Sequence, residues 1–280
     1  MLCSSPQQIL QHRLVCLIVV LMLISISNQS HATKCSQLKV SGNPEYPPLL
    51  WRDRANPKQL TGVSIALLKQ AVADLNIKVN AVYVGPWSRA QAKVKANELD
   101  MLAGAFLTVE RTTYMEYVKP AYTQVANVVF VPSGKGFKFN HWNDLKNKRG
   151  ATLINNSFGQ KFDQYAQDHL ALYGVRSLEI AFKLLLAKRA DYVVYELYPG
   201  LAYAKAMGIS QELRHFANYI NSEPLYYTFA LKSPCLKGNL PKHLSNFIKS
   251  QKNTNLEKEL LEEYLQRWQS QAHLVLDAPP

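Results

Sequence analysis

Segments with the hydrophobic spacing of a helix alternate with short apolar runs along the middle of the chain. Within residues 63–75, the apolar side chains of Ile65, Leu68, Val72 and Leu75 recur at helical spacing, which predicts a helix with one buried face. Short apolar runs bounded by polar residues are typical of buried strands instead. We therefore predict strands at residues 38–42, 78–84, 101–105, 151–154 and 190–195, and further helices from residue 86 and at residues 158–169, 177–188 and 197–207. This alternation indicates an α/β fold with a parallel sheet covered by helices on both faces.

Residues 1–32 have the composition of an export signal. Arg13 supplies a positive charge, residues 14–26 are apolar except for Ser25, and the small residues of S-H-A end at Ala32. The apolar stretch is shorter than the roughly 20 residues of a membrane-spanning helix, so an uncleaved anchor is the weaker alternative. The sequence predicts an exported protein that is cleaved near Ala32.

Export changes how the cysteines are interpreted. Cys3 and Cys16 lie within the predicted signal, which leaves Cys35 and Cys235 in the exported chain. Because exported proteins meet an oxidising environment, a disulfide is reasonable, and two buried thiols are the alternative. The seven histidines are scattered without metal-ligand spacing, so neither a metal site nor a cofactor is predicted.

The chain is basic, with 32 lysines and arginines, 20 aspartates and glutamates, and a formal net charge of +12. Such a balance is compatible with nucleic-acid binding. The basic residues are spread along the chain, however, with no arginine-rich tract or reading motif, so no nucleic-acid partner is predicted. We interpret the charge as a source of solubility and of attraction to anionic solutes or membrane surfaces.

The segment of residues 101–122 carries the strongest candidate for a binding site. Its apolar run is followed by a polar corner from Thr108 to Arg111. In open α/β sheets, ligands bind just beyond the carboxyl ends of the strands. A guanidinium placed there can hold a carboxylate by two parallel hydrogen bonds. The alternative is that Arg111 pairs with Glu110 or Glu116 on a solvated loop.

Two polar positions in the second half of the chain also follow predicted strands. The N–H groups of Asn155-Asn156-Ser157 and the Ser157 hydroxyl can face an anion, with ordinary N-capping by Ser157 as the alternative. Glu196 directly follows the last predicted strand, and a solvated carboxylate is its alternative. A buried charge is costly without a partner, and a zwitterion between Arg111 and Glu196 would supply both partners.

The run D-M-L-A-G-A-F-L-T-V-E-R, with V-K-P-A-Y after six further residues, resembles the first-lobe signature of the family 3 extracellular solute-binding proteins. These are periplasmic receptors for amino acids that serve ABC importers, and the resemblance covers residues 38–268. It implies a periplasmic-binding-protein-like type II fold, in which two doubly wound α/β lobes are joined by two crossing strands. Lobe 1 would contain residues 33–123 and 225–280, and lobe 2 residues 124–224.

The resemblance also implies roles for individual residues. Arg111 would hold a ligand carboxylate and Glu196 its ammonium group. Tyr46 and Trp87 would form walls of the pocket, although a turn-packing tyrosine and a core tryptophan are the alternatives. The full set of implied ligand-binding residues is Tyr46, Trp87, Phe106, Thr108, Arg111, Asn156, Ser157 and Glu196.

The chain departs from the family pattern at two places. Phe106 stands where a hydroxyl residue usually helps to hold the carboxylate, and Asn155 and Asn156 replace small or hydroxyl residues. Either Thr108 and backbone groups take over that contact, or the ligand is not a plain α-amino acid. An aromatic residue at position 106 would favour a flat or apolar ligand.

The family's strand order places Cys35 and Cys235 at the same end of lobe 1, which implies a disulfide between them. The implied function is a monomeric, non-enzymatic periplasmic receptor that passes an amino acid or related small carboxylate to an inner-membrane ABC permease. Periplasmic cyclohexadienyl dehydratases resemble these receptors and give an enzymatic alternative, with Glu196 as the acid. A soluble ligand-sensing subunit is a third reading.

Overall fold

The computed structural model describes residues 35–134, 136–252 and 254–272. The predicted export signal at residues 1–32 lies outside these described residues. Within them, no helix combines the length and apolar character needed to cross a bilayer.

Ten strands of the described chain form one sheet, and three short strands form a second. The order in the larger sheet is β10-β9-β11-β8-β13-β6-β1-β5, with β12 paired to β8 and β7 paired to β13. Its strands are β1 (Gln37–Ser41), β5 (Lys78–Ala81), β6 (Met101–Phe106), β7 (Met115–Tyr117), β8 (Thr123–Pro132), β9 (Arg149–Leu153), β10 (Ala171–Val175), β11 (Tyr192–Glu196), β12 (Leu213–His215) and β13 (Asn221–Ala230). The smaller sheet contains β2 (Glu45–Tyr46), β3 (Leu50–Arg52) and β4 (Leu60–Thr61).

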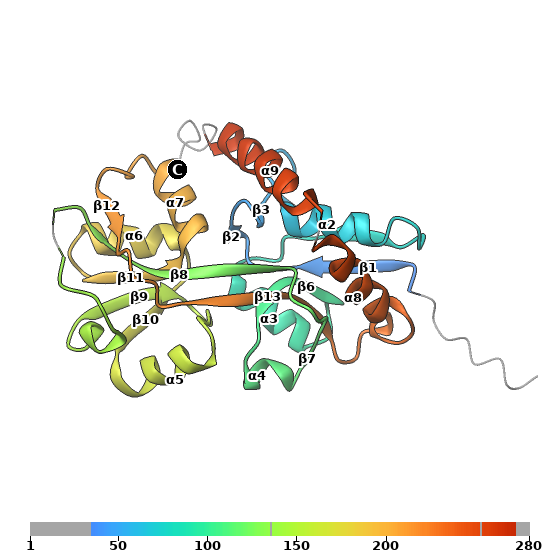
Figure 1. Ribbon diagram of the computed structural model, residues 1–280, viewed down its shortest axis with the longest axis horizontal. Coiled ribbons are helices and arrows are strands. Elements are labelled where there is room, and N and C mark those ends of the chain that lie inside the picture. Colours follow the sequence, from blue (N-terminus) through green and yellow to red (C-terminus); the bar gives the residue numbers. More distant parts are fainter. Residues whose placement is uncertain (1–34, 135, 253, 273–280) are drawn as a thin grey trace, which may run out of the picture. The chain divides into compact units, whose positions relative to one another are not determined.

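The large sheet contains two parallel groups of strands. In lobe 1, β1 pairs in parallel with β5 and β6, and in lobe 2, β9 pairs in parallel with β10 and β11. The long strands β8 and β13 lie antiparallel to each other between the groups and run across the molecule (Figure 1). The predicted fold of two α/β lobes joined by two crossing strands is therefore confirmed.

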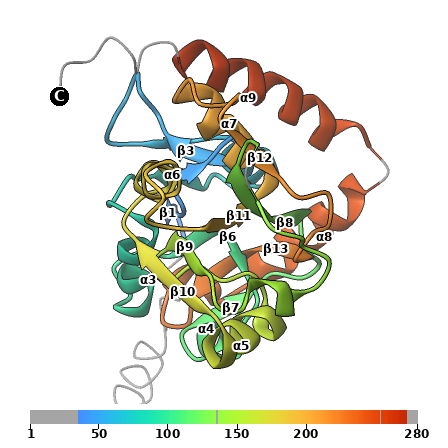
Figure 2. The same ribbon diagram turned by 90° about the vertical axis from the view of Figure 1, so that its left-hand side faces the viewer.

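Helices cover both faces of each parallel group. In lobe 1, α2 and α9 lie on one side of the strands and α3 on the other (Figure 1). In lobe 2, α6 and α5 lie on opposite sides of β9 and β10 (Figure 2). The helices are α2 (Val63–Ala71), α3 (Trp87–Lys95), α4 (Val109–Thr112), α5 (Gln160–His169), α6 (Leu178–Leu186), α7 (Leu197–Ala206), α8 (Leu240–Gln251) and α9 (Leu256–Ala272), with short 3-10 turns at Trp142–Leu145 and Pro234–Leu236.

Two of the differences from the sequence prediction concern the end of a helix and an edge strand. The helix expected over residues 63–75 ends at Ala71, and residues 72–76 turn into the next strand through Asn76, whose φ is 53°. Strand β10 was not predicted, because it pairs only with β9 and alternates between exposed and half-buried residues. An edge strand of this kind carries a weak hydrophobic signal.

A β-bulge at Gly104 redirects the end of β6. The register against β13 shifts there, so that Ala103 pairs with Tyr227 and Ala105 with Tyr226. Gly104 has a φ of 132°, and a Cβ at this position would lie 2.9 Å from the Tyr122 hydroxyl. The extra residue moves the side chains after it to the opposite face. Phe106 consequently packs in the same core as Ala103.

A disulfide joins Cys35, just before β1, to Cys235, just after β13, with 4.9 Å between their Cα atoms. This pairing was predicted, and it follows from the sheet: β1 is parallel to β6 and β13 is antiparallel to β6. The bridge links positions 200 residues apart, so it constrains most of the unfolded chain.

Cys235→Ser is expected to lower the free energy of unfolding by on the order of 2–4 kcal/mol, because the unfolded chain regains the entropy of a long loop. Urea unfolding of the oxidised wild type and the variant measures this difference. Cys35→Ser should give the same loss, and dithiothreitol should destabilise only the wild type. Equal stability of the oxidised wild type and both variants would contradict the prediction.

Candidate functional site

The carboxyl ends of four strands meet around a small inner hollow. β1 is followed by Asn43, β6 ends at Phe106, β9 leads to Asn156, and β11 ends at Glu196. The inner hollow has a volume of about 20 Å³, roughly the space of one water molecule. It is lined by Asn43, Tyr46, Leu50, Trp87, Ala103, Gly104, Ala105, Phe106, Arg111, Asn156, Glu196 and Leu225. Six of the eight predicted site residues are therefore brought together here.

Glu196 is the charged group of the inner hollow on the lobe 2 side. It terminates β11, whose five residues are all buried, and its own exposed fraction is 1 %. The Asn156 amide donates to Oε1 at 3.4 Å, while Oε2 has no hydrogen-bond partner. Burial raises the pKa of the Glu196 carboxyl to about 8, and contacts with Asn156, Tyr46 and Arg111 oppose that shift only in part. The unliganded side chain is therefore largely protonated at neutral pH.

Aromatic groups bound the inner hollow from lobe 1. Tyr46 packs edge-to-face on Tyr195 with ring centroids 6.5 Å apart, and its hydroxyl makes no hydrogen bond of good geometry, although it lies close enough to Glu196 to lower the pKa of that carboxyl. The Trp87 indole N–H is also buried without a partner. Unpaired buried polar groups cost free energy unless a ligand or water satisfies them. The hollow therefore presents the unpartnered Trp87 N–H together with the Tyr46 hydroxyl and the Glu196 carboxyl.

Arg111, from lobe 1, also lines the inner hollow and is 4 % exposed. Its Nε donates to Gln91 Oε1 at 3.2 Å, one terminal nitrogen to the Phe106 carbonyl at 3.2 Å, and the other to the Asn155 carbonyl at 3.1 Å. The guanidinium also lies 5.4 Å from the centroid of the Trp87 ring. Within the described chain, no salt bridge involves Arg111, so its charge is solvated by neutral oxygens.

These bonds account for three of the five N–H groups of the guanidinium. One N–H on each terminal nitrogen lies outside these three bonds, and the Tyr114 hydroxyl is a further polar neighbour of the guanidinium. The sequence alternative, a solvated pairing with Glu110 or Glu116, does not fit a side chain this buried.

Hydrogen bonds between the lobes flank the inner hollow on two sides. On one side, the Asn155 carbonyl of lobe 2 accepts from Arg111 and from Gln91 Nε2, the latter at 3.0 Å. On the other side, Glu45 Oε2 accepts from the Leu178 N–H at the start of α6 at 3.0 Å, and Tyr195 donates to the Glu45 carbonyl at 2.8 Å. Burial raises the pKa of the Glu45 carboxyl to about 7. The lobes are therefore in contact around the site.

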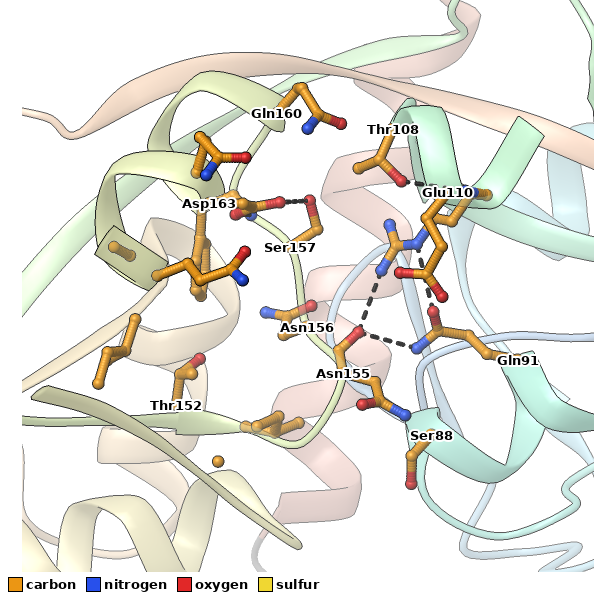
Figure 3. A pocket seen from close by; sticks show the side chains of 18 of the residues that line it. Ser88, Gln91, Thr108, Glu110, Thr152, Asn155, Asn156, Ser157, Gln160 and Asp163 are labelled. Carbon is orange, nitrogen blue, oxygen red and sulfur yellow. Dashed lines mark hydrogen bonds between the residues drawn. The ribbon is translucent and has the colours of Figure 1, made fainter. Parts of the chain in front are cut away.

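An outer hollow of about 850 Å³ continues from the inner one between α3, α4 and α5. Figure 3 shows Gln91 and Glu110 on its lobe 1 wall facing Asn156, Ser157 and Asp163 on its lobe 2 wall. Arg111 and Asn156 line both hollows, so the two spaces share these residues.

The two remaining predicted residues line only the outer hollow. Thr108 is the N-cap of α4, and its hydroxyl accepts from the Arg111 backbone N–H at 3.2 Å. The Ser157 hydroxyl bonds to the Asp163 carboxylate, and Phe158 N–H donates to the same carboxylate at 2.8 Å. The strand–helix corner at residues 155–157 therefore directs these donors to the protein's own acid.

Sequence reasoning missed Gln91, Glu45 and Asp163 as parts of the site, and it considered the N–H group of Asn155 but not its carbonyl. Gln91 lies four residues after Trp87, so their shared helix face was an available signal. The Asn155 carbonyl has no side-chain signature, since it is a backbone group at a position with a φ of 58°. Within the described residues, no group of His, Cys, Asp and Glu side chains could hold a metal ion.

The sequence profile of the bacterial extracellular solute-binding proteins, family 3, matches residues 38–268. Comparison with curated protein sequences found no match. Several solved structures share the fold. An arginine-binding protein (ArgBP) variant from T. maritima aligns with a TM-score of 0.68 at 18% identity, covering 82% of this chain and 96% of that one.

The GluR0 ligand-binding core in complex with L-glutamate aligns with a TM-score of 0.66 at 20% identity, over 82% of this chain and 98% of the other. The ancestral amino-acid-binding protein AncCDT-1, described as a precursor of cyclohexadienyl dehydratase, aligns with a TM-score of 0.63 at 22% identity, over 82% and 95%. At these identities, the likeness establishes the fold alone.

Proposed function

Because this chain belongs to the bacterial extracellular solute-binding proteins, family 3, we propose that it is an exported receptor that captures an amino acid or a related small carboxylate between its lobes. In this proposal, the export signal at residues 1–32 delivers it to the periplasm as a monomer. An inner-membrane ABC permease then accepts the ligand from the closed receptor. Similar structures include proteins that bind arginine or glutamate.

The observation that carries the proposal is that Glu196 and Arg111 line the same hollow. Glu196 offers an unpaired carboxylate oxygen, and Arg111 carries a positive charge that no described acid neutralises by a salt bridge. An ammonium group beside Glu196 would favour its ionised form and lower its pKa from about 8. A carboxylate beside Arg111 would neutralise the guanidinium. A zwitterion would therefore supply a partner of opposite charge to each of the two residues.

Ligand entry requires the lobes to separate, because the inner hollow holds only about 20 Å³. The interlobe bonds at Asn155 and Glu45 break on opening. A ligand stabilises the closed form by its greater affinity for that form. The same closure excludes water and strengthens the polar contacts.

The test begins with mass spectrometry of small molecules that co-purify with the exported protein, followed by calorimetry with arginine, glutamine and glutamate. Wild type is expected to bind at least one amino acid. Glu196→Gln should weaken that binding by roughly 2–5 kcal/mol, because the isosteric amide cannot pair with an ammonium. Glu212→Gln, at an exposed turn, is the matched control. Unchanged affinity in Glu196→Gln would refute the assigned role.

A second candidate function rests on the same carboxyl. A Glu196 pKa of about 8 keeps a proton available at neutral pH, as a general acid requires. A cyclohexadienyl dehydratase-like elimination would use that proton. Steady conversion of prephenate by wild type, abolished by Glu196→Gln, would establish the enzyme, whereas binding of an amino acid without turnover supports the receptor.

A further inference from the structure

The N-terminal end of α5 is already occupied by the protein's own acids. Asp163 Oδ2 accepts a hydrogen bond from the Ser157 hydroxyl, and Asp163 Oδ1 accepts one from the Phe158 N–H at 2.8 Å. The Gly159 N–H in turn donates to the Ser157 hydroxyl at 3.2 Å. Donors at the start of a helix, aided by its dipole, otherwise suit an external anion. Here they converge on an internal carboxylate.

A second acid approaches the same helix end from β13. Gly159, with a φ of 90°, precedes α5, and a Cβ on it would lie only 2.2 Å from Glu223 Oε1. Asn221 holds that oxygen through a 2.9 Å hydrogen bond. Burial and the nearby Asp163 both raise the pKa of the Glu223 carboxyl. The helix end therefore faces two carboxyl groups before any ligand arrives.

This filled corner lies within reach of the candidate ligand. Ser157 and Asp163 line the outer hollow together with Arg111 and Asn156, and the latter two also line the inner hollow. Asp163 is close enough to Arg111 for that charge to lower its pKa, although burial dominates and raises it. A ligand held between Glu196 and Arg111 that carried a second anionic group would direct it into this region. It would meet a carboxylate instead of free donors.

We propose that Asp163 sets the specificity of the site by filling the anion position at the start of α5. The ligand then carries an ammonium group for Glu196 and a single anionic group for Arg111. Amino acids with a second acidic group are rejected, because specificity arises as much from repulsion as from attraction. This inference rests on the proposed receptor function for the identity of the ligand.

The first test compares L-glutamine with L-glutamate by calorimetry in wild type, Asp163→Ala and Asp163→Ser. Both substitutions free Ser157 Oγ and the Phe158 N–H, while Glu223 remains beside Gly159 in every protein compared. The affinity for glutamate relative to glutamine is expected to rise at least about tenfold, or roughly 1.4 kcal/mol. Asp168→Ala, an exposed acid on the same helix, should leave the ratio unchanged. An unchanged ratio in both Asp163 variants would overturn the inference.

A second test requires no amino acid. Thermal unfolding is measured in 10 mM sodium sulfate and in sodium chloride of equal ionic strength. Asp163→Ala and Asp163→Ser should gain roughly 2–4 °C from sulfate beyond any gain in wild type or Asp168→Ala, because the opened corner binds the anion. Asp163→Asn should gain nothing extra, since the amide oxygen still fills the corner.

The two tests distinguish a failure of the proposed receptor function from a failure of the proposed role of Asp163. If no protein binds an amino acid but the opened corner still gains sulfate stabilisation, the receptor proposal fails while the filled corner stands. If wild type binds glutamate as tightly as glutamine, Asp163 does not reject a second acid. If Asp163→Asn gains as much stability from sulfate as Asp163→Ala, the negative charge of Asp163 excludes the anion, and occupation of the corner by the side chain does not.

Discussion

At pH 8, Glu196→Gln is expected to be more stable than the unliganded wild type, by on the order of several kcal/mol. Burial raises the pKa of Glu196 to about 8 in the folded protein, against an ordinary value of 4.5. Its protonated form is therefore favoured by folding. The stabilisation is fully present below about pH 4.5 and is lost as the pH rises to 8, at up to about 1.4 kcal/mol per pH unit. The amide has no proton to lose.

Urea unfolding of both proteins at pH 5 and pH 8 measures the effect. The free energy of unfolding of the variant should still decline somewhat as the pH rises. The cause is Glu45, whose pKa is also raised by burial, to about 7. Glu212→Gln should follow the wild type. Identical pH dependence in wild type and Glu196→Gln would show that Glu196 is ionised and solvated in the unliganded protein.

Arg111→Ala should weaken ligand binding by roughly 2–5 kcal/mol, or about 30- to several-thousand-fold. The substitution removes the charged fork of a side chain that is only 4 % exposed and lines the same hollow as Glu196. It should also lower the free energy of unfolding by about 1–3 kcal/mol, because the Gln91 oxygen and the Phe106 and Asn155 carbonyls lose a donor. Calorimetry with the co-purified ligand and urea unfolding measure the two effects.

Arg111→Lys should recover only part of the affinity, since an ammonium cannot reproduce a bidentate fork or reach three acceptors in fixed directions. Arg89→Ala, an exposed arginine on α3, is the matched control and should change neither quantity. Ligand affinity that is unchanged in Arg111→Ala would mean that Arg111 joins the lobes without contacting the ligand.

The sequence by itself predicted the fold class, and its resemblance to the family 3 solute-binding proteins selected most of the candidate site. Runs such as Tyr192–Glu196, buried along their whole length, mark parallel strands covered on both faces, because alternation disappears when neither face meets water. Arg111 and Glu196 were candidates because each lies beyond the carboxyl end of a predicted strand, and the family resemblance then favoured a ligand-binding role over a solvated charge. Local pattern is enough to predict such strands, because it reflects burial along one element.

Only the tertiary structure decided which face each side chain packs on and which hydrogen-bond partner each polar group has. Simple alternation along β6 places Phe106 on the face of Leu102, and the bulge at Gly104 moves it to the face of Ala103. The corner at Ser157 has the sequence of an anion site, yet its donors bond to Asp163 six residues later. Glu196 looks like an ordinary carboxylate until burial raises its pKa. Register, pairing and desolvation arise from elements distant in sequence, so no local pattern encodes them.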